Sequence, residues 1–145
     1  MVFLINIDSY IRADDATNFL GVISVASQVD KNEDLIRFLM MARKKVREPV
    51  VESELILAYA KTNRLLELEE FISTPNIAQI QVIGDRCFDE GKFEAAKILF
   101  TSVSNWARLA STLVHLHDYQ SAVDCARKAN STKYGFYLIL EFGRK

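Results

Sequence analysis

Two stretches of the chain carry the same pattern of residue types: DEGKFEAAKILF at residues 89–100 and LHDYQSAVDCAR at residues 116–127. In both, an aromatic residue is followed at intervals of three by a small residue and then an apolar residue, and corresponding positions lie 26 residues apart. Intervals of three place these side chains on one face of a helix. A short turn precedes each helix, around Gly91 and around His117. A chain that repeats one helical face at this spacing is predicted to stack similar helical units.

The pattern continues towards the N-terminus in the same register. It recurs 28 residues before the first of these stretches and again, in part, 33 residues before that. Units of this size fit a two-helix hairpin, and no single hairpin can bury both of its apolar faces. We therefore predict an α-solenoid in which each hairpin presents the repeated face to the next. The predicted packing positions are Leu35, Phe38, Leu65, Leu68, Phe71, Phe93, Ala96, Leu99, Tyr119, Ala122 and Cys125.

A bundle of antiparallel helices would carry similar apolar stripes, so the pattern alone leaves that alternative open. In a solenoid, Ala96 and Ala122 are expected to be small because helices cross closely there. Trp106 shares a helix face with Leu109 and Leu113 and is predicted to be at least partly buried.

The chain is predicted to be all-α. Five glycines and two prolines in 145 residues leave few turn residues for an all-β protein, and the apolar spacing is close to 3.6 residues throughout. Candidate N-caps, among them Asn105 and Asp118, and a first-turn proline, Pro49, divide the chain into about nine or ten helices. The helices with the clearest boundaries are expected over residues 16–28, 33–46, 50–61, 64–73, 77–90, 92–103, 106–116 and 119–129.

Length and charge narrow the class of protein. The 145 residues, half of them hydrophobic, suffice for one domain, residues 1–145. Eighteen basic and 19 acidic side chains give a net charge of −1, which argues against binding to nucleic acid or to an anionic membrane. The apolar segments at residues 1–7 and 134–142 are too short to span a membrane, and the first lacks the basic flank of a signal peptide. A cytosolic protein is predicted.

No pattern for catalysis, a cofactor or a metal stands out. His115 and His117 would point to different sides of a helix, and no cluster completes a metal-ligand set. Cys87 and Cys125 sit within apolar helical patterns and are predicted to be buried, reduced thiols. Phosphate-binding and hydrolase motifs do not occur, so we expect no enzyme. The basic run at residues 43–47 fits a solvated helix end, with an acidic or phospholipid partner as the alternative.

Five segments together closely resemble the leg of the clathrin heavy chain: MARKKVRE, ELILAYAKTNRLLELEEFI, GDRCFDEGKFEAAKILF, SNWARLASTLVHL and AVDCARKANST. The resemblance runs with little or no gap over residues 7–132. It implies a right-handed α-solenoid of short antiparallel helical hairpins, similar to tetratricopeptide repeats. Within the leg, the stretch corresponds to the region around the knee and the start of the proximal leg.

The resemblance implies a structural function. Clathrin heavy chains combine an N-terminal β-propeller that recruits adaptors, a leg of helical hairpins and a C-terminal trimerisation hub. Three legs form a triskelion, and triskelia interweave into the coats of vesicles used in endocytosis and intracellular protein transport. The implied partners are clathrin heavy chains and the clathrin light chain. The implied location is the cytoplasmic face of coated vesicles and coated pits, without membrane insertion and without nucleic acid.

The ends of the chain depart from this resemblance. Residues 133–145 form a divergent tail whose apolar residues are expected either to fold back over the last helical pair or to drive self-association. The alternative function is a helical-repeat adaptor that binds peptides in a concave groove. Such a module needs basic or amide side chains that recur at one position of successive inner helices, and no such column is found at the inner-face positions that the pattern identifies.

Overall fold

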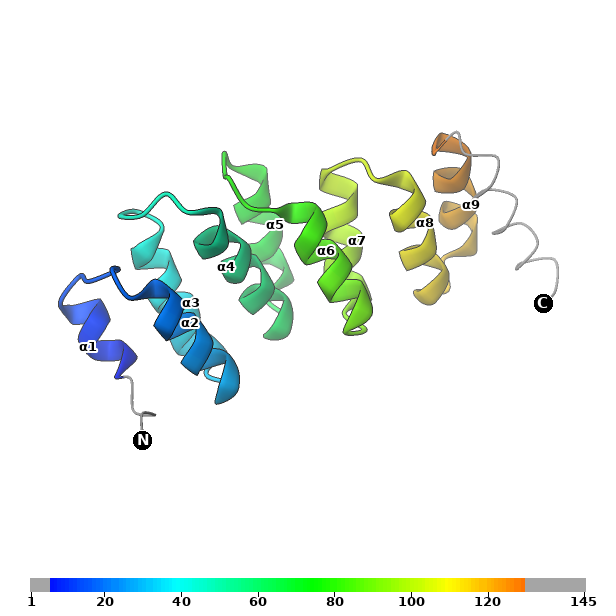
Figure 1. Ribbon diagram of the computed structural model, residues 1–145. Helices are drawn as coiled ribbons and strands as arrows, with labels where there is room; N and C mark the ends of the chain where they lie inside the picture. Colours follow the sequence, from blue (N-terminus) through cyan, green and yellow to red (C-terminus); the bar gives the residue numbers. More distant parts are fainter. Residues whose placement is uncertain (1–5, 130–145) are drawn as a thin grey trace. The chain divides into compact units, whose positions relative to one another are not determined.

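The computed structural model describes residues 6–129, and every regular element in that range is an α-helix (Figure 1). The prediction of an all-α chain is confirmed for these residues. The expectations for the tail at residues 133–145 lie outside the described residues and stay predictions. In chain order the helices are α1 (Ile7–Arg12), α2 (Phe19–Gln28), α3 (Asn32–Ala42), α4 (Pro49–Lys61), α5 (Leu65–Ser73), α6 (Ile80–Asp89), α7 (Phe93–Ser102), α8 (Trp106–His115) and α9 (Tyr119–Lys128).

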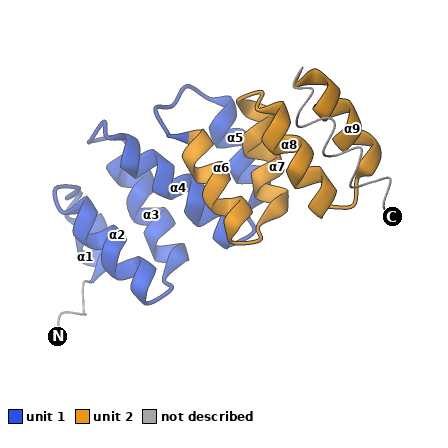
Figure 2. Ribbon diagram, turned by 45° about the vertical axis from the view of Figure 1, so that its right-hand side comes forward, with its two compact units in different colours: residues 1–79 blue, residues 80–145 orange. Residues whose placement is uncertain are grey.

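The chain divides into two compact units, residues 1–79 and residues 80–145 (Figure 2). The first contains α1 to α5 and the second α6 to α9. Within each unit, consecutive helices from α2 onwards run in alternating directions and pack against each other, and α1 packs against α3. Each unit is therefore a stack of short antiparallel helices, as the α-solenoid prediction requires. The single segment over residues 1–145 remains a prediction.

The core of each unit lies between the stacked helices. In the first unit, α4 is buried over the whole stretch from Leu55 to Ala60, and it packs against both α3 and α5. In the second unit, the side chains of Leu99 and Phe100 on α7 and Ala110 on α8 are completely buried. Burial of such side chains is the main source of stability for short helices, which are marginal in isolation.

Several predicted helix starts are confirmed. Pro49 occupies the first turn of α4. N–H groups in that turn have no acceptor within the helix, so the lack of an N–H in proline costs no hydrogen bond there. Asn105 caps α8 by accepting a hydrogen bond from the Arg108 N–H at 3.2 Å, and Asp118 caps α9 by accepting one from the Ser121 N–H at 3.3 Å. These caps are local in sequence, which is why the sequence reveals them.

Two helices in the first unit are shorter than predicted. α2 begins at Phe19 rather than at residue 16, because the Asp15 carboxylate accepts the Thr17 N–H at 3.0 Å and closes a separate turn. α3 ends at Ala42 rather than at residue 46. There the N–H groups of residues 44 and 45 bond to carbonyls only three residues back, at 3.2 Å and 2.9 Å, so the last turn tightens and the α-helix ends.

The first helix of the second unit also begins later than predicted. α6 starts at Ile80, three residues after the expected start at residue 77. The N–H groups of Ile77 and Gln79 are bonded instead to the side chains of Glu52 at 2.6 Å and Ser53 at 2.8 Å, both on α4. α1 is a helix that the sequence pattern did not delimit, since its six residues are too few for a clear period.

A single turn geometry joins most consecutive helices. At six of the joints one residue has a positive φ, between 55° and 78°, and the next N–H bonds to the carbonyl five residues back at 2.7–3.0 Å. This is the Schellman ending of a helix, and at five of the six joints the following helix begins two residues after the positive-φ residue. After Asp14 the next helix, α2, begins only at Phe19. The positive-φ residues are Asp14, Asp30, Asn63, Gly91, Ser104 and His117.

These joints predict opposite effects for two substitutions. Gly91→Ala should lower the free energy of unfolding by about 1 kcal/mol, because an L side chain is strained at φ +78° although its Cβ would meet no atom within 4 Å. Ser104→Gly should raise it by about 0.5–1 kcal/mol, since serine at φ 55° carries that strain already. Urea denaturation measures both. Ser24→Gly, inside α2, is the control and should destabilise. If Ser104→Gly and Ser24→Gly changed the free energy of unfolding equally, the strain argument would be contradicted.

Candidate functional site

The eleven predicted packing positions lie on every second helix, namely α3, α5, α7 and α9. Three of them, Leu65, Phe93 and Tyr119, are half-buried. Each of these three is the first residue of its helix, so its side chain lies at the edge of the stack. The remaining positions are buried: Leu35, Phe38, Leu68, Phe71, Ala96, Leu99, Ala122 and Cys125. That these residues carry the repeated contact between hairpins is our proposal.

Phe93 connects three helices of the second unit. Its ring meets the ring of Phe88 on α6 edge to face, with centroids 5.4 Å apart, and stacks on His115 of α8 at 4.4 Å and 6°. His117 lies in the following joint, where its Nδ1 is 2.9 Å from the Tyr119 hydroxyl. The two histidines therefore have separate neighbours, but for a different reason than predicted, because His117 lies in the joint after α8 and not on the helix.

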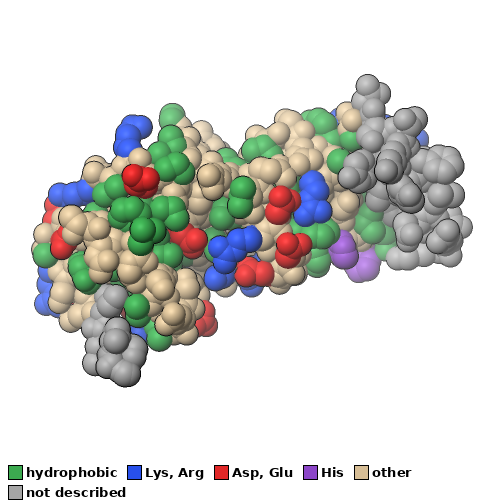
Figure 3. Space-filling view, in the orientation of Figure 1, with side chains coloured by type: hydrophobic (Ala, Val, Ile, Leu, Met, Phe, Trp, Pro, Cys, Tyr) green, Lys and Arg blue, Asp and Glu red, His purple; other side chains and the backbone are tan. Residues whose placement is uncertain are grey.

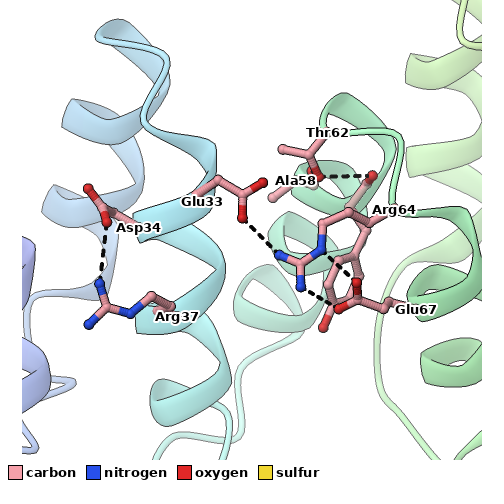
Figure 4. Close-up of polar contacts among 8 residues, drawn as sticks. Glu33, Asp34, Arg37, Ala58, Thr62, Arg64 and Glu67 are labelled. Atoms are coloured by element: carbon pink, nitrogen blue, oxygen red, sulfur yellow. Dashed lines mark hydrogen bonds and ion pairs between the residues drawn. The ribbon is translucent and has the colours of Figure 1, made fainter.

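Polar contacts join next-but-one helices of the first unit. Arg37 on α3 is 3.0 Å from the Asp8 carboxylate on α1. Arg64, which directly precedes α5, is 3.0 Å from Glu33 on α3 and 2.7 Å from Glu67 in the first turn of α5 (Figure 4). The hydrogen bonds to Glu67 raise the pKa of Arg64, which stays charged. Arg37, Asp8 and Glu33 are largely exposed and Arg64 is half-buried, so these pairs specify alignment more than stability.

The second unit has an equivalent link between α6 and α8. Asp85 accepts a hydrogen bond from Arg108 Nε at 3.0 Å, and Gln81 accepts one from the Asn105 amide at 2.8 Å. The Arg108 guanidinium also lies over the Phe88 ring, 4.4 Å from its centroid. Contacts between next-but-one helices are characteristic of a stack, in which every second helix meets its counterpart in the next hairpin.

The remaining sequence candidates are structural. Cys87 and Cys125 are buried, reduced thiols, as predicted, and burial raises the pKa of the Cys125 thiol so that it stays protonated. Trp106 is partly buried, with the Lys128 ammonium 4.8 Å from its ring, which confirms the prediction for that residue. Within residues 6–129, no group of three His, Cys, Asp or Glu side chains is placed to hold a metal ion.

The basic run at residues 43–47 is not uniformly solvated. Arg43 is half-buried, lies 4.4 Å from the centroid of the Phe71 ring and is 3.5 Å from Glu52. Lys45 pairs with Asp14. On the face shown in Figure 3, basic and acidic side chains are interspersed. No local pattern indicates the role of Arg43, because its partners Glu52 and Phe71 lie beyond the neighbouring helical turns of the chain.

The sequence matches the family model described as the region in clathrin and VPS over residues 10–139. The chain belongs to the Clathrin family. This match confirms the resemblance to the clathrin heavy chain, and it includes residues 133–139 of the tail. Within residues 6–129, no helix has both the length and the hydropathy of a membrane span.

Clathrin heavy chains from distant organisms are similar to the chain. It is 58% identical over 127 residues to the clathrin heavy chain of Dictyostelium discoideum and 61% identical over 127 residues to that of Drosophila melanogaster. It is 60% identical over 127 residues to clathrin heavy chain 2 of Homo sapiens. Each match covers 88% of this chain and 8% of the relative. The chain therefore spans less than a tenth of the length of the curated relatives it matches.

Proposed function

We propose that the chain is a structural segment of a clathrin-type coat leg that supports triskelion and lattice assembly in endocytosis and vesicle transport. The observation that carries this proposal is the repeated contact between next-but-one helices, Arg64 with Glu33 in one unit and Arg108 with Asp85 in the other. Together with the buried helical faces, these contacts hold each stack in one shape. The segment acts through that shape and through lateral contacts, without catalysis.

The proposed partners follow from the same function. Clathrin heavy chains are the first, and the clathrin light chain is the second. The segment acts on the cytoplasmic face of coated vesicles and coated pits, held there by the coat rather than by insertion into the bilayer. A net charge of −1 with mixed surface charge supports a protein partner over nucleic acid.

A replacement experiment tests the proposal. The 127 matched residues of this chain replace the equivalent stretch of the Drosophila clathrin heavy chain, to which they are 61% identical. The chimeric heavy chain is expected to trimerise and to assemble into sedimentable coats with a yield within about twofold of the parent, because the segment reproduces the shape of the leg. Sedimentation and electron microscopy measure assembly.

The matched control carries Ala122→Arg in the same chimera and should assemble poorly, since Ala122 is completely buried. A chimera that is folded and trimeric but forms no coats would contradict the proposal. Binding of a peptide by the isolated chain at micromolar affinity, with no assembly by the chimera, would favour the peptide-binding adaptor instead.

A further inference from the structure

The chain segment between α5 and α6 is held to the first unit by two side chains. This connector, Thr74–Gln79, contains no helix and ends where the second unit begins. Glu52 Oε2 accepts the Ile77 N–H at 2.6 Å, and Ser53 Oγ accepts the Gln79 N–H at 2.8 Å. Both acceptors come from the first turns of α4, 25 and 26 residues earlier in the chain.

The two acceptor side chains are largely covered, although Ile77, which donates to Glu52, is itself exposed. Ser53 is 4% exposed, and the Glu52 side chain is 12% exposed. A hydrogen bond to a carboxylate in such surroundings is stronger than one on the surface, and an acceptor that loses its donor there stays unsatisfied. Breaking either contact is therefore unfavourable unless the connector moves out and lets water in.

Glu52 is itself oriented by a second contact. Its other oxygen, Oε1, lies 3.5 Å from Arg43 Nη2, and the Arg43 guanidinium rests over the Phe71 ring, 4.4 Å from the centroid. The carboxylate thus links the end of α3, the start of α4 and the connector. Phe71 lies on α5, the helix directly before the connector, so the same group of contacts holds both ends of this stretch to α4.

The connector also has an internal turn that fits this attachment. Asn76 accepts the Ala78 N–H at 3.2 Å and donates to the Thr74 carbonyl at 2.9 Å. With Ile77 and Gln79 bonded to α4, most of the connector's N–H groups are satisfied without any helix. This explains why residues 77–79 do not extend α6.

We propose that Glu52 and Ser53 form a clamp that makes the connector part of the first unit, and that opening the clamp converts residues 74–79 into a flexible joint. The clamp is a conformational device. When it is closed, the chain is held to the first unit as far as Gln79. When it is open, the chain is held to that unit only as far as Ser73, the end of α5. The proposal does not depend on the coat function, because it concerns only contacts within this chain.

Amide hydrogen exchange of the whole chain, resolved by residue with NMR, tests the clamp. In Glu52→Ala the Ile77 amide is expected to exchange about tenfold faster or more, and in Ser53→Ala the Gln79 amide is expected to do so. Amides in α2 should keep their rates within about twofold in both variants, since the opening is local. Limited proteolysis should cut residues 74–79 faster in the same variants.

Matched controls make the same chemical change at exposed positions of the same unit, Glu69→Ala on α5 and Ser27→Ala on α2. Both should leave the exchange of the connector amides unchanged. Glu52→Met keeps the side-chain length but removes both acceptor oxygens, so it tests the clamp if Glu52→Ala destabilises the whole unit. Unprotected connector amides in the parent chain, unchanged rates in the Glu52 and Ser53 variants, or equal acceleration throughout α2 to α5 in Glu52→Met and Ser53→Ala would each overturn the proposal.

Discussion

Ala96→Arg and Ala122→Arg should each lower the free energy of unfolding by about 4 kcal/mol or more. Both alanines are completely buried, on α7 and α9. A guanidinium at either position overfills a close helix contact and places a charge where no partner is available. Because small domains are stable by only about 5–15 kcal/mol, the second unit is expected to unfold at least in part.

Circular dichroism melts measure this effect. Gln120→Arg is the matched control, because residue 120 lies on α9, two positions from Ala122, and is exposed. It should change the free energy of unfolding by less than about 0.5 kcal/mol. If either alanine variant melts together with the parent chain, its helix face is not packed against a neighbour, and the proposed repeat register is wrong.

Gly84→Ala should lower the free energy of unfolding by about 1–2 kcal/mol, although alanine is the better helix former. A Cβ atom at Gly84 would lie 2.8 Å from Cε1 of Phe100 and 3.2 Å from two further ring carbons. The Phe100 ring is completely buried, so it has no free space into which it can move. Overpacking therefore outweighs the gain in helix propensity of about 1 kcal/mol.

Gly21→Ala provides the contrast, since Gly21 is also inside a helix. Its added Cβ would meet the side-chain amide of Asn18 at 2.5 Å, but Asn18 is exposed and can rotate away, losing only its hydrogen bond to Tyr10. We expect this variant to be unchanged or up to about 1 kcal/mol more stable in urea denaturation. If Gly84→Ala and Gly21→Ala lowered the free energy of unfolding equally, the close contact between α6 and α7 would be refuted. Phe100→Leu should relieve much of the cost at Gly84 in a double-mutant cycle.

Helices and joints were predictable where their causes are local. The aromatic, small and apolar pattern located α7 and α9, and the caps Asn105 and Asp118 are the ones the sequence indicated. A cap or a helix face depends on residues three or four positions apart, so single-sequence reasoning can detect it. The same applies to Cys125, whose burial follows from its position on the repeated face.

Segments whose partners are distant in the chain were not predictable. The sequence placed the start of α6 at residue 77, but Glu52 and Ser53 take the backbone N–H groups that would have entered that helix. Likewise, Arg43 in the basic run turned out to rest on Phe71 and to pair with Glu52. Nothing within four residues of either site distinguishes these arrangements from an ordinary helix or a solvated basic cluster.

By itself, therefore, the sequence determined that the chain is helical, that it repeats one helical face, and that it is similar to the clathrin heavy-chain leg. These properties depend on short-range periodicity and on the linear order of the residues, both of which are present in the sequence itself. Only the tertiary structure decided where α6 begins, which charged side chains are structural, and which small residues mark close helix contacts. Those features arise from competition between local helix formation and acceptors or rings contributed by other helices, and that competition is settled only once the helices have packed.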